Sequence, residues 1–137
     1  WPVVGLDEAA SQADVIATAT GAYGVVNSKH LDSMKDGAFI LNVGHVAQEI
    51  DVSYLKSNAA HSEPMPYVNA YKLGDKTLYL LADGSMFNLT AGYGDSINAF
   101  DVTLAVMAAG IGFIVNEGAR SEKGLYLLPE KAWKGAL

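Results

Sequence analysis

The chain has 137 residues, half of them hydrophobic, with a net charge of −6 and no cysteine. This length and composition predict one globular domain with a hydrophobic core. The acidic balance and the scattered Lys and Arg residues argue against a nucleic-acid partner, because they could not neutralise many phosphates. The lack of cysteine excludes disulfides and thiolate metal sites and is compatible with a reducing cytoplasm, where we expect the protein.

The two ends of the chain carry little information about targeting. The N-terminus, Trp1-Pro2, is not a basic segment followed by an apolar run, so no signal peptide is visible. The longest apolar stretch, residues 102–115, is shorter than the roughly 20 residues that cross a bilayer, so we expect no membrane partner. Because the chain begins with Trp and not with Met, we expect it to be a fragment of a longer protein.

The first half of the chain alternates between strand and helix patterns. Residues 2–12 predict a short strand and then a polar turn or short helix. The β-branched runs at residues 14–20 and 38–44 are typical of parallel strands buried on both faces. Helices are predicted at residues 27–37, capped by Asn27 or Ser28, and at residues 51–58, capped by Asp51. This alternation predicts a parallel sheet with right-handed crossovers.

The second half follows another pattern. Two strand patterns, residues 67–73 and 77–82, flank Gly74-Asp75 and predict a β-hairpin. A long helix is predicted at residues 95–115, with Asp95 or Ser96 as its cap. The last ten residues predict a short helix with Pro129 near its first turn.

Polar residues follow both predicted parallel strands. The first strand ends in Thr18-Ala19-Thr20-Gly21 and the second in Asn42-Val43-Gly44-His45. Ligands of open α/β sheets bind at the carboxyl ends of the strands, and neighbouring strand ends lie about 5 Å apart. Glycines there would let a flat ligand approach the backbone. The same residues also suit plain turns, and a single His after a strand is more often a turn residue than a catalyst.

Other candidate sites carry weaker signals. Residues 87–95 form a glycine-rich segment before the long helix, which suits either an anion or carbonyl site or a simple connection capped by Asp95. No G-x-G-x-x-G motif follows an early strand and no P-loop is present. His30 and His61 are expected at the surface, and no residues have metal-ligand spacing.

Four segments together resemble the S-adenosyl-L-homocysteine hydrolase (adenosylhomocysteinase) family. They are "ADVIATATG", "KHLDSMKDGAFILNVGHVAQEID", "AYKLGDKTLYLLADGSMFNL" and "GLYLLPEKAW". The resemblance extends in order over nearly the whole chain. It implies an α/β fold: a partial Rossmann-type, doubly wound parallel sheet with an added β-hairpin and a long C-terminal helix. Residues 1–137 would be a single domain, a fragment of the NAD-binding domain that lacks the first βαβ unit.

The resemblance also implies an activity and a cofactor. In this family a tightly bound NAD oxidises the ribose 3′-hydroxyl of S-adenosyl-L-homocysteine, homocysteine is eliminated, water adds, and the ketone is reduced again. The products are adenosine and homocysteine, and the reaction is reversible. The small-molecule partner would be a nucleoside thioether, and family analogy implies a homo-oligomer, a tetramer in the parent protein.

The matching positions imply a set of cofactor-binding residues and no catalytic residue within the chain. Val43, Gly44 and His45 match a nicotinamide-side contact, which makes His45 an active-site neighbour. The other residues expected at the cofactor are Ala19, Thr20, Asn42, Asn88 and Asp95.

Some family features are changed or lie outside the chain. Asp95 replaces a family histidine that contacts the nucleoside and the cofactor, and an ionised carboxylate can only accept hydrogen bonds. The family's catalytic lysine, aspartates and histidine, its glycine-rich turn and its C-terminal tail match nothing here. We therefore expect no hydrolase activity and weak NAD affinity from the chain alone.

Two other functions stay open at this point. One is a divergent, non-catalytic family member that binds NAD and regulates another process. The other is the nucleotide domain of a different NAD-dependent oxidoreductase, such as a 2-hydroxy-acid dehydrogenase. The second would need a catalytic Arg with a Glu/His pair, and the single arginine, Arg120, follows the long predicted helix.

Overall fold

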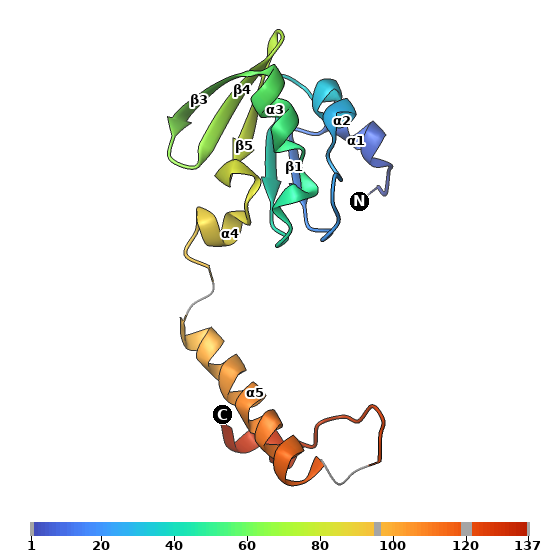
Figure 1. Ribbon diagram of the computed structural model, residues 1–137, viewed down its shortest axis with the longest axis vertical. Coiled ribbons are helices and arrows are strands. Elements are labelled where there is room, and N and C mark those ends of the chain that lie inside the picture. Colours follow the sequence, from blue (N-terminus) through green and yellow to red (C-terminus); the bar gives the residue numbers. More distant parts are fainter. Residues whose placement is uncertain (1, 95–96, 119–121, 137) are drawn as a thin grey trace. The chain divides into compact units, whose positions relative to one another are not determined.

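The computed structural model describes residues 2–94, 97–118 and 122–136 (Figure 1). The chain divides into two compact units, Trp1–Tyr93 and Gly94–Leu137, and each is described by itself below. The assignment of residues 1–137 to a single domain stays a prediction.

The first unit contains a five-stranded sheet in the order β1-β2-β5-β4-β3. Its strands are β1 (Val15–Thr18), β2 (Phe39–Asn42), β3 (Ala60–Met65), β4 (Val68–Leu73) and β5 (Lys76–Leu81). The first three strands in the spatial order run parallel to one another, whereas β4 pairs antiparallel with both of its neighbours, β5 and β3. The α/β class, the partial Rossmann-type sheet and the added hairpin are therefore confirmed.

Helices alternate with these strands along the chain. In chain order they are α1 (Leu6–Gln12), α2 (Ser28–Ser33), η1 (Ala47–Glu49), α3 (Val52–Asn58), η2 (Ala82–Gly84) and α4 (Phe87–Thr90). Two predicted caps are confirmed. The Asn27 Oδ1 accepts from the Lys29 N–H at 3.1 Å, and the Asp51 Oδ1 accepts from the Tyr54 N–H at 3.0 Å.

The hydrophobic core lies on one face of the sheet. Ala10, Leu31 and Leu55 from the three helices α1, α2 and α3 belong to one buried cluster with Ile16 and Ile40 of the strands. The prediction that both parallel strands are buried on two faces is wrong for this chain. Val15 is 57% exposed and Phe39 38% exposed, because the described helices of this first unit pack on the other face.

Three further sequence expectations differ from the structure. Residues 2–5 form no strand, and the first element is α1. The strand β3 was not predicted, since its residues are all exposed and include Pro64, so that only pairing with β4 defines it. His30 is buried and not at the surface: its Nδ1 accepts from the Asn27 N–H at 3.2 Å, and its Nε2 lies 2.9 Å from the Asp7 Oδ1.

Lys76 at the start of β5 holds the end of α2. Its ammonium donates to the carbonyls of Leu31, Asp32 and Met34 at 2.8, 2.5 and 2.9 Å. A lysine that caps several last-turn carbonyls stabilises a helix end.

We expect Lys76→Met to lower the free energy of unfolding by about 1.5 kcal/mol in urea melts. Lys72→Met is the control, because Lys72 reaches a single turn carbonyl, that of Asp75, and should cost under about 0.5 kcal/mol. Equal costs for the two variants would contradict this role.

The second unit consists of the long helix α5 (Ile97–Asn116), the short helix α6 (Glu130–Trp133) and the turn η4 (Lys134–Ala136). The predicted long and C-terminal helices are confirmed, whereas the proposed caps Asp95 and Ser96 lie outside the described residues. Apolar residues occur all round α5, and Met107, Ile111 and Ile114 are more than half exposed. None of the helices described is both long enough and apolar enough to cross a membrane.

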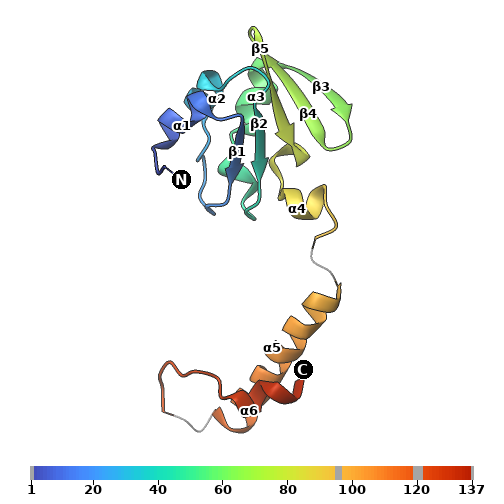
Figure 2. The same ribbon diagram turned by 180° about the vertical axis from the view of Figure 1, so that it is seen from behind.

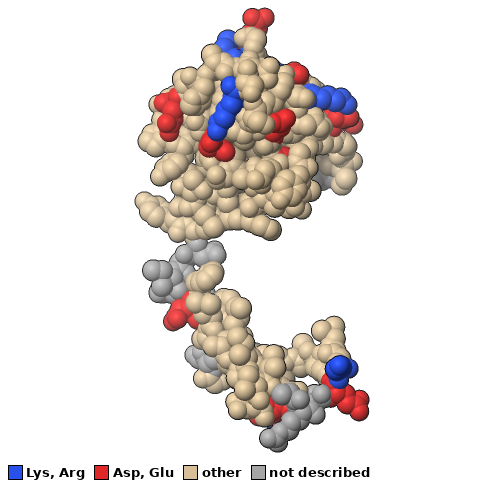
Figure 3. All heavy atoms as spheres, viewed as in Figure 1, with Lys and Arg blue, Asp and Glu red and all other residues tan. Residues whose placement is uncertain are grey.

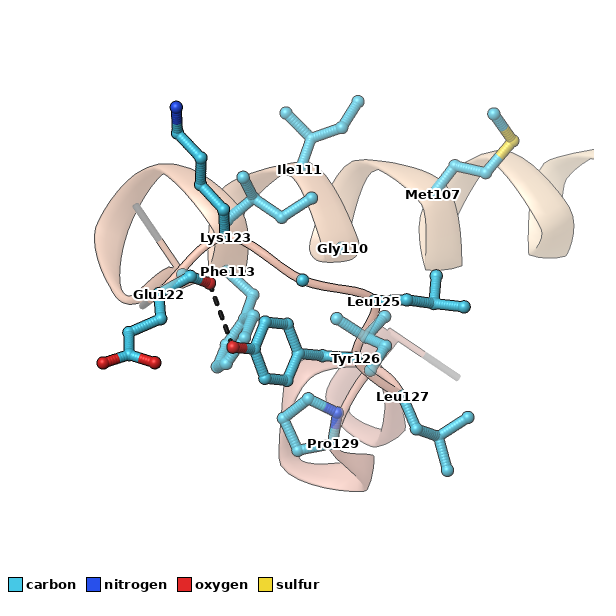
Figure 4. Close-up of a pocket in the computed structure, with 14 residues that line it drawn as sticks. Met107, Gly110, Ile111, Phe113, Glu122, Lys123, Leu125, Tyr126, Leu127 and Pro129 are labelled. Carbon is cyan, nitrogen blue, oxygen red and sulfur yellow. Dashed lines mark hydrogen bonds between the residues drawn. The ribbon is translucent and has the colours of Figure 1, made fainter. Parts of the chain in front are cut away.

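An open pocket of about 820 Å³ lies between α5 and the segment that leads to α6 (Figure 4). Its wall is mainly apolar and includes Ile111, Phe113 and Leu125. The Tyr126 hydroxyl closes one side by donating to the Glu122 carbonyl at 3.0 Å. Among the described residues its charged lining consists of Glu122 and Lys123, and the rest of the wall offers mainly packing surface.

Candidate cofactor site at the carboxyl edge of the sheet

The two predicted polar strand ends are neighbours. Thr18 pairs with Asn42 in the parallel register of β1 and β2, and the Val43 N–H donates to the Thr18 carbonyl at 2.8 Å. Figure 2 shows β1, β2 and β5 running to one edge of the unit, with α4 beside it. An isolated parallel bridge between Asn42 and Met86 ties the start of α4 to the end of β2.

Asn42 joins three segments at this edge through a fully buried side chain. Its amide donates to the carbonyls of Val46 at 2.9 Å and Gly84 at 3.1 Å. Its Oδ1 accepts from the Gly44 N–H at 2.7 Å and from the Thr18 hydroxyl at 3.3 Å. Both donors and both acceptor positions are thus used within the protein, and the amide has no hydrogen-bonding group left for a ligand.

Glu49 is a second fully buried polar residue and holds the loop after β1. Its carboxylate accepts from the Gly21 N–H at 2.8 Å, the Thr20 N–H at 3.0 Å and the Thr20 hydroxyl at 2.8 Å. The backbone of Glu49 is fixed in turn, since the Val26 N–H donates to its carbonyl at 2.9 Å. A carboxylate that accepts several N–H groups makes strong, charge-assisted hydrogen bonds.

Gly44 lies directly against these two side chains. A Cβ at this position would stand 2.5 Å from the Glu49 Oε1, 3.3 Å from the Asn42 Oδ1 and 3.5 Å from the Ala19 Cα. Because real Cβ atoms do not approach a fixed oxygen to 2.5 Å, the close packing of the two strand ends requires glycine here.

The exposed residues above this buried layer form a surface that we call the rim: Ala19, Thr20, Val43, His45 and Asn88. The segments that build it, residues 15–28, 38–50 and 84–94, contain no Lys, Arg or Asp, and Glu49 is their single acidic residue. On the face of this unit that Figure 3 shows, the charged side chains lie away from the edge that carries α4. The rim is therefore an uncharged surface supported by one buried carboxylate.

Comparisons with known proteins identify the family. Residues 1–94 match the model of the S-adenosyl-L-homocysteine hydrolase NAD-binding domain. The chain belongs to this family. It is 38% identical to an adenosylhomocysteinase of Archaeoglobus fulgidus over 94% of its own length and 32% of the relative's. It is 35% identical to an S-inosyl-L-homocysteine hydrolase of Methanopyrus kandleri over 93% of its own length and 31% of the relative's. The chain thus spans about a third of the length of these curated relatives, and the cofactor of its domain family is NAD.

The adenosylhomocysteinase-family domain brings most of the predicted site residues together at one edge. Ala19, Thr20, Val43 and His45 are exposed there, and Gly44 is half-buried. Their contact with a cofactor stays a prediction, as does that of Asn88. Asn42 belongs to the buried layer and would reach a ligand only through its neighbours. Asp95 lies outside the described residues.

Glu49 was not among the predicted site residues. One signal was available in the sequence, because Glu49 is the single charged residue between Gly37 and Ile50. An isolated acidic residue in an apolar segment is seldom buried without hydrogen-bond partners. Its donors, the N–H groups of Thr20 and Gly21, are nearly thirty positions away, so sequence spacing could not identify them. No group of three or more His, Asp or Glu among the described residues is arranged to hold a metal ion.

Low pH should lower the stability of this domain, because it protonates the buried carboxylate of Glu49. Burial would raise the pKa of this carboxyl, but the hydrogen bonds from Thr20 and Gly21 outweigh burial and hold the pKa below its ordinary value of 4.5. Such a group stabilises the fold fully above its unfolded pKa, and this contribution is lost as pH falls through the folded pKa. We expect the melting temperature to fall below about pH 4.5, and less steeply in Glu49→Gln than in the natural chain. Asp7, whose pKa is lowered by a hydrogen bond from Lys29, contributes equally to both proteins. Parallel pH profiles of melting temperature would contradict the assignment.

Proposed function

We propose that this chain is the part of an NAD-dependent S-adenosyl-L-homocysteine hydrolase that receives the nicotinamide end of the cofactor. The observation that carries the proposal is the uncharged rim at the ends of β1 and β2, built over buried Asn42 and Glu49. In open α/β sheets this edge is the usual ligand site.

The hydrogen bonding at this edge fits a neutral ring better than a phosphate. Anions bind where backbone N–H groups or cations are free. Here the N–H groups of Thr20 and Gly21 are bound to Glu49, and that of Gly44 is bound to Asn42. A phosphate would also meet the negative charge of Glu49. A flat amide-bearing ring needs few donors and can lie against the backbone at Gly44.

The residues of the rim suggest roles toward the cofactor and the substrate. When bound, NAD would supply the oxidising group for a secondary alcohol of the substrate. Val43 would offer apolar surface to the ring, and the His45 imidazole and Asn88 amide would offer hydrogen bonds at its border. Glu49 would hold the loop of Ala19 and Thr20 in place.

The substrate we propose is a nucleoside thioether, S-adenosyl-L-homocysteine or a relative with another base. The similar proteins include both an adenosylhomocysteinase and an S-inosyl-L-homocysteine hydrolase at 38% and 35% identity, so similarity does not choose between adenine and hypoxanthine. Asp95 in place of the family histidine favours a departure from adenosine, or else a divergent family member that binds NAD without catalysis. We also propose a cytoplasmic homo-oligomer as the parent protein, and no hydrolase activity for the chain alone.

The protein encoded by the complete gene tests this function. We expect NAD to be released from the purified protein on denaturation, and homocysteine to form from the adenosyl or the inosyl thioether. Bound NAD with no turnover of either substrate would favour the non-catalytic alternative. A protein with neither bound NAD nor turnover would overturn the proposal.

A further inference from the structure

Glu49 is isolated from other charges as well as from water. It is the one acidic residue in the three segments that build the edge of the sheet, and no Lys or Arg occurs in them. None of the ion pairs among the described residues includes Glu49. Its charge is balanced by the dipoles of two N–H groups and one hydroxyl and by no formal positive charge.

The position of this carboxylate places it beneath the rim. It binds the backbone of Thr20 and Gly21 and lies against Gly44, so it touches both loops that border the proposed ring site. A buried charge is screened less by water and salt than an exposed one. Any ligand that gains or loses charge at the rim would therefore experience this negative charge.

Building on the proposed function, we infer that Glu49 is a positioning residue that fixes the loop of Thr20 against Gly44, and that its negative charge favours the oxidised over the reduced cofactor. The oxidised nicotinamide ring carries a positive charge and the reduced ring is neutral. A carboxylate near the ring therefore stabilises the oxidised form selectively. No other charged residue of the edge offsets this preference.

Two substitutions of Glu49 separate the effect of its charge from the effect of its hydrogen bonds. Glu49→Gln removes the charge but keeps most of the hydrogen bonds, since its Oε1 can accept from the N–H groups and its amide can donate to the Thr20 hydroxyl. Glu49→Ala removes both. Glu63→Gln is the matched control, because Glu63 is an exposed carboxylate on β3, the far edge strand from β1.

The experiment measures dissociation constants of NAD⁺ and NADH separately, by calorimetry on the complete-gene protein freed of cofactor. We expect Glu49→Gln to weaken NAD⁺ relative to NADH by a factor on the order of ten, the size expected for one charge acting across several ångströms of protein. Glu49→Ala should weaken both forms, and Glu63→Gln should leave the ratio unchanged.

The outcomes distinguish this inference from the function on which it rests. An unchanged NAD⁺/NADH ratio in Glu49→Gln would overturn the role of the charge. Natural affinity for both forms in a folded Glu49→Ala would overturn the positioning role. If that variant does not fold, Glu49→Asp decides, because it keeps the charge but is one methylene too short to hold the N–H groups of Thr20 and Gly21, and natural affinity for both forms would overturn the positioning role there too. Absence of NAD binding by the natural protein would instead count against the proposed function.

Discussion

Replacing Asn42 with Ala is expected to lower the free energy of unfolding of the chain by about 3 kcal/mol. The side chain is fully buried and satisfies the carbonyls of Val46 and Gly84 and the N–H of Gly44. Ala would leave the Gly84 carbonyl and the Gly44 N–H without the partner that they have here, at a largely buried edge, whereas the Val46 carbonyl would keep the Glu49 N–H at 3.2 Å. The loss should exceed that of an ordinary hydrogen-bond deletion, because one side chain serves three segments.

Asn58→Ala is the matched control for this prediction. Asn58 is exposed, and its amide makes one local hydrogen bond, to the Tyr54 carbonyl at 2.8 Å. Its loss should cost less than about 0.5 kcal/mol. Urea melts followed by far-ultraviolet circular dichroism would measure both values. A loss below about 1 kcal/mol for Asn42→Ala would mean that water replaces the amide and that the edge is less closed than the structure implies.

The sequence was sufficient to predict those strands, turns and helix starts that depend on local residue patterns. Two β-branched runs ended by polar residues predicted β1 and β2 and their adjacency, and Gly74-Asp75 predicted the hairpin of β4 and β5. Asn27 and Asp51 marked the starts of α2 and α3 correctly, since capping depends on bonds within three or four residues.

Features that depend on distant partners were not predictable in this way. His30 follows Lys29 in a polar segment, and its burial depends on a contact with Asp7, 23 positions earlier, as well as on the local Asn27 N–H. The exposed strand β3 has no periodic pattern and is defined by its partner β4. Glu49 likewise depends on donors from the loop after β1, and its role emerges only when β1 and β2 are placed side by side.

The predicted site combined residues that the structure separates into a buried layer and an exposed rim. The sequence placed Asn42 beside Val43 and His45 and so suggested one ligand-binding group. Alternation along the strand end separates them: Asn42 is buried and holds the edge, whereas Val43 and His45 are exposed. A polar residue at a strand end can therefore support a site without reaching the ligand.

Gly44→Ala should disturb both the buried layer of Asn42 and Glu49 and the exposed rim above it. The new Cβ would lie 2.5 Å from the Glu49 Oε1, and that oxygen cannot move freely because it accepts from the Gly21 N–H. We expect the free energy of unfolding to fall by about 2 kcal/mol, as for other overpacked positions. If the rim holds NAD, its affinity in the complete-gene protein should fall as well, since the displaced carboxylate releases the loop of Thr20.

Two comparisons make the prediction specific. Gly112→Ala adds the same methyl group on α5, where nothing lies within 4 Å, and should be neutral or stabilising by up to about 1 kcal/mol. In a Glu49→Ala background the cost of Gly44→Ala should shrink to about 0.5 kcal/mol, because the nearest clashing atom is gone and the remaining neighbours are farther away. Additive costs in this double-mutant cycle would show that the two residues are independent. The tight contact between β2 and the carboxylate would then not be what requires glycine at this strand end.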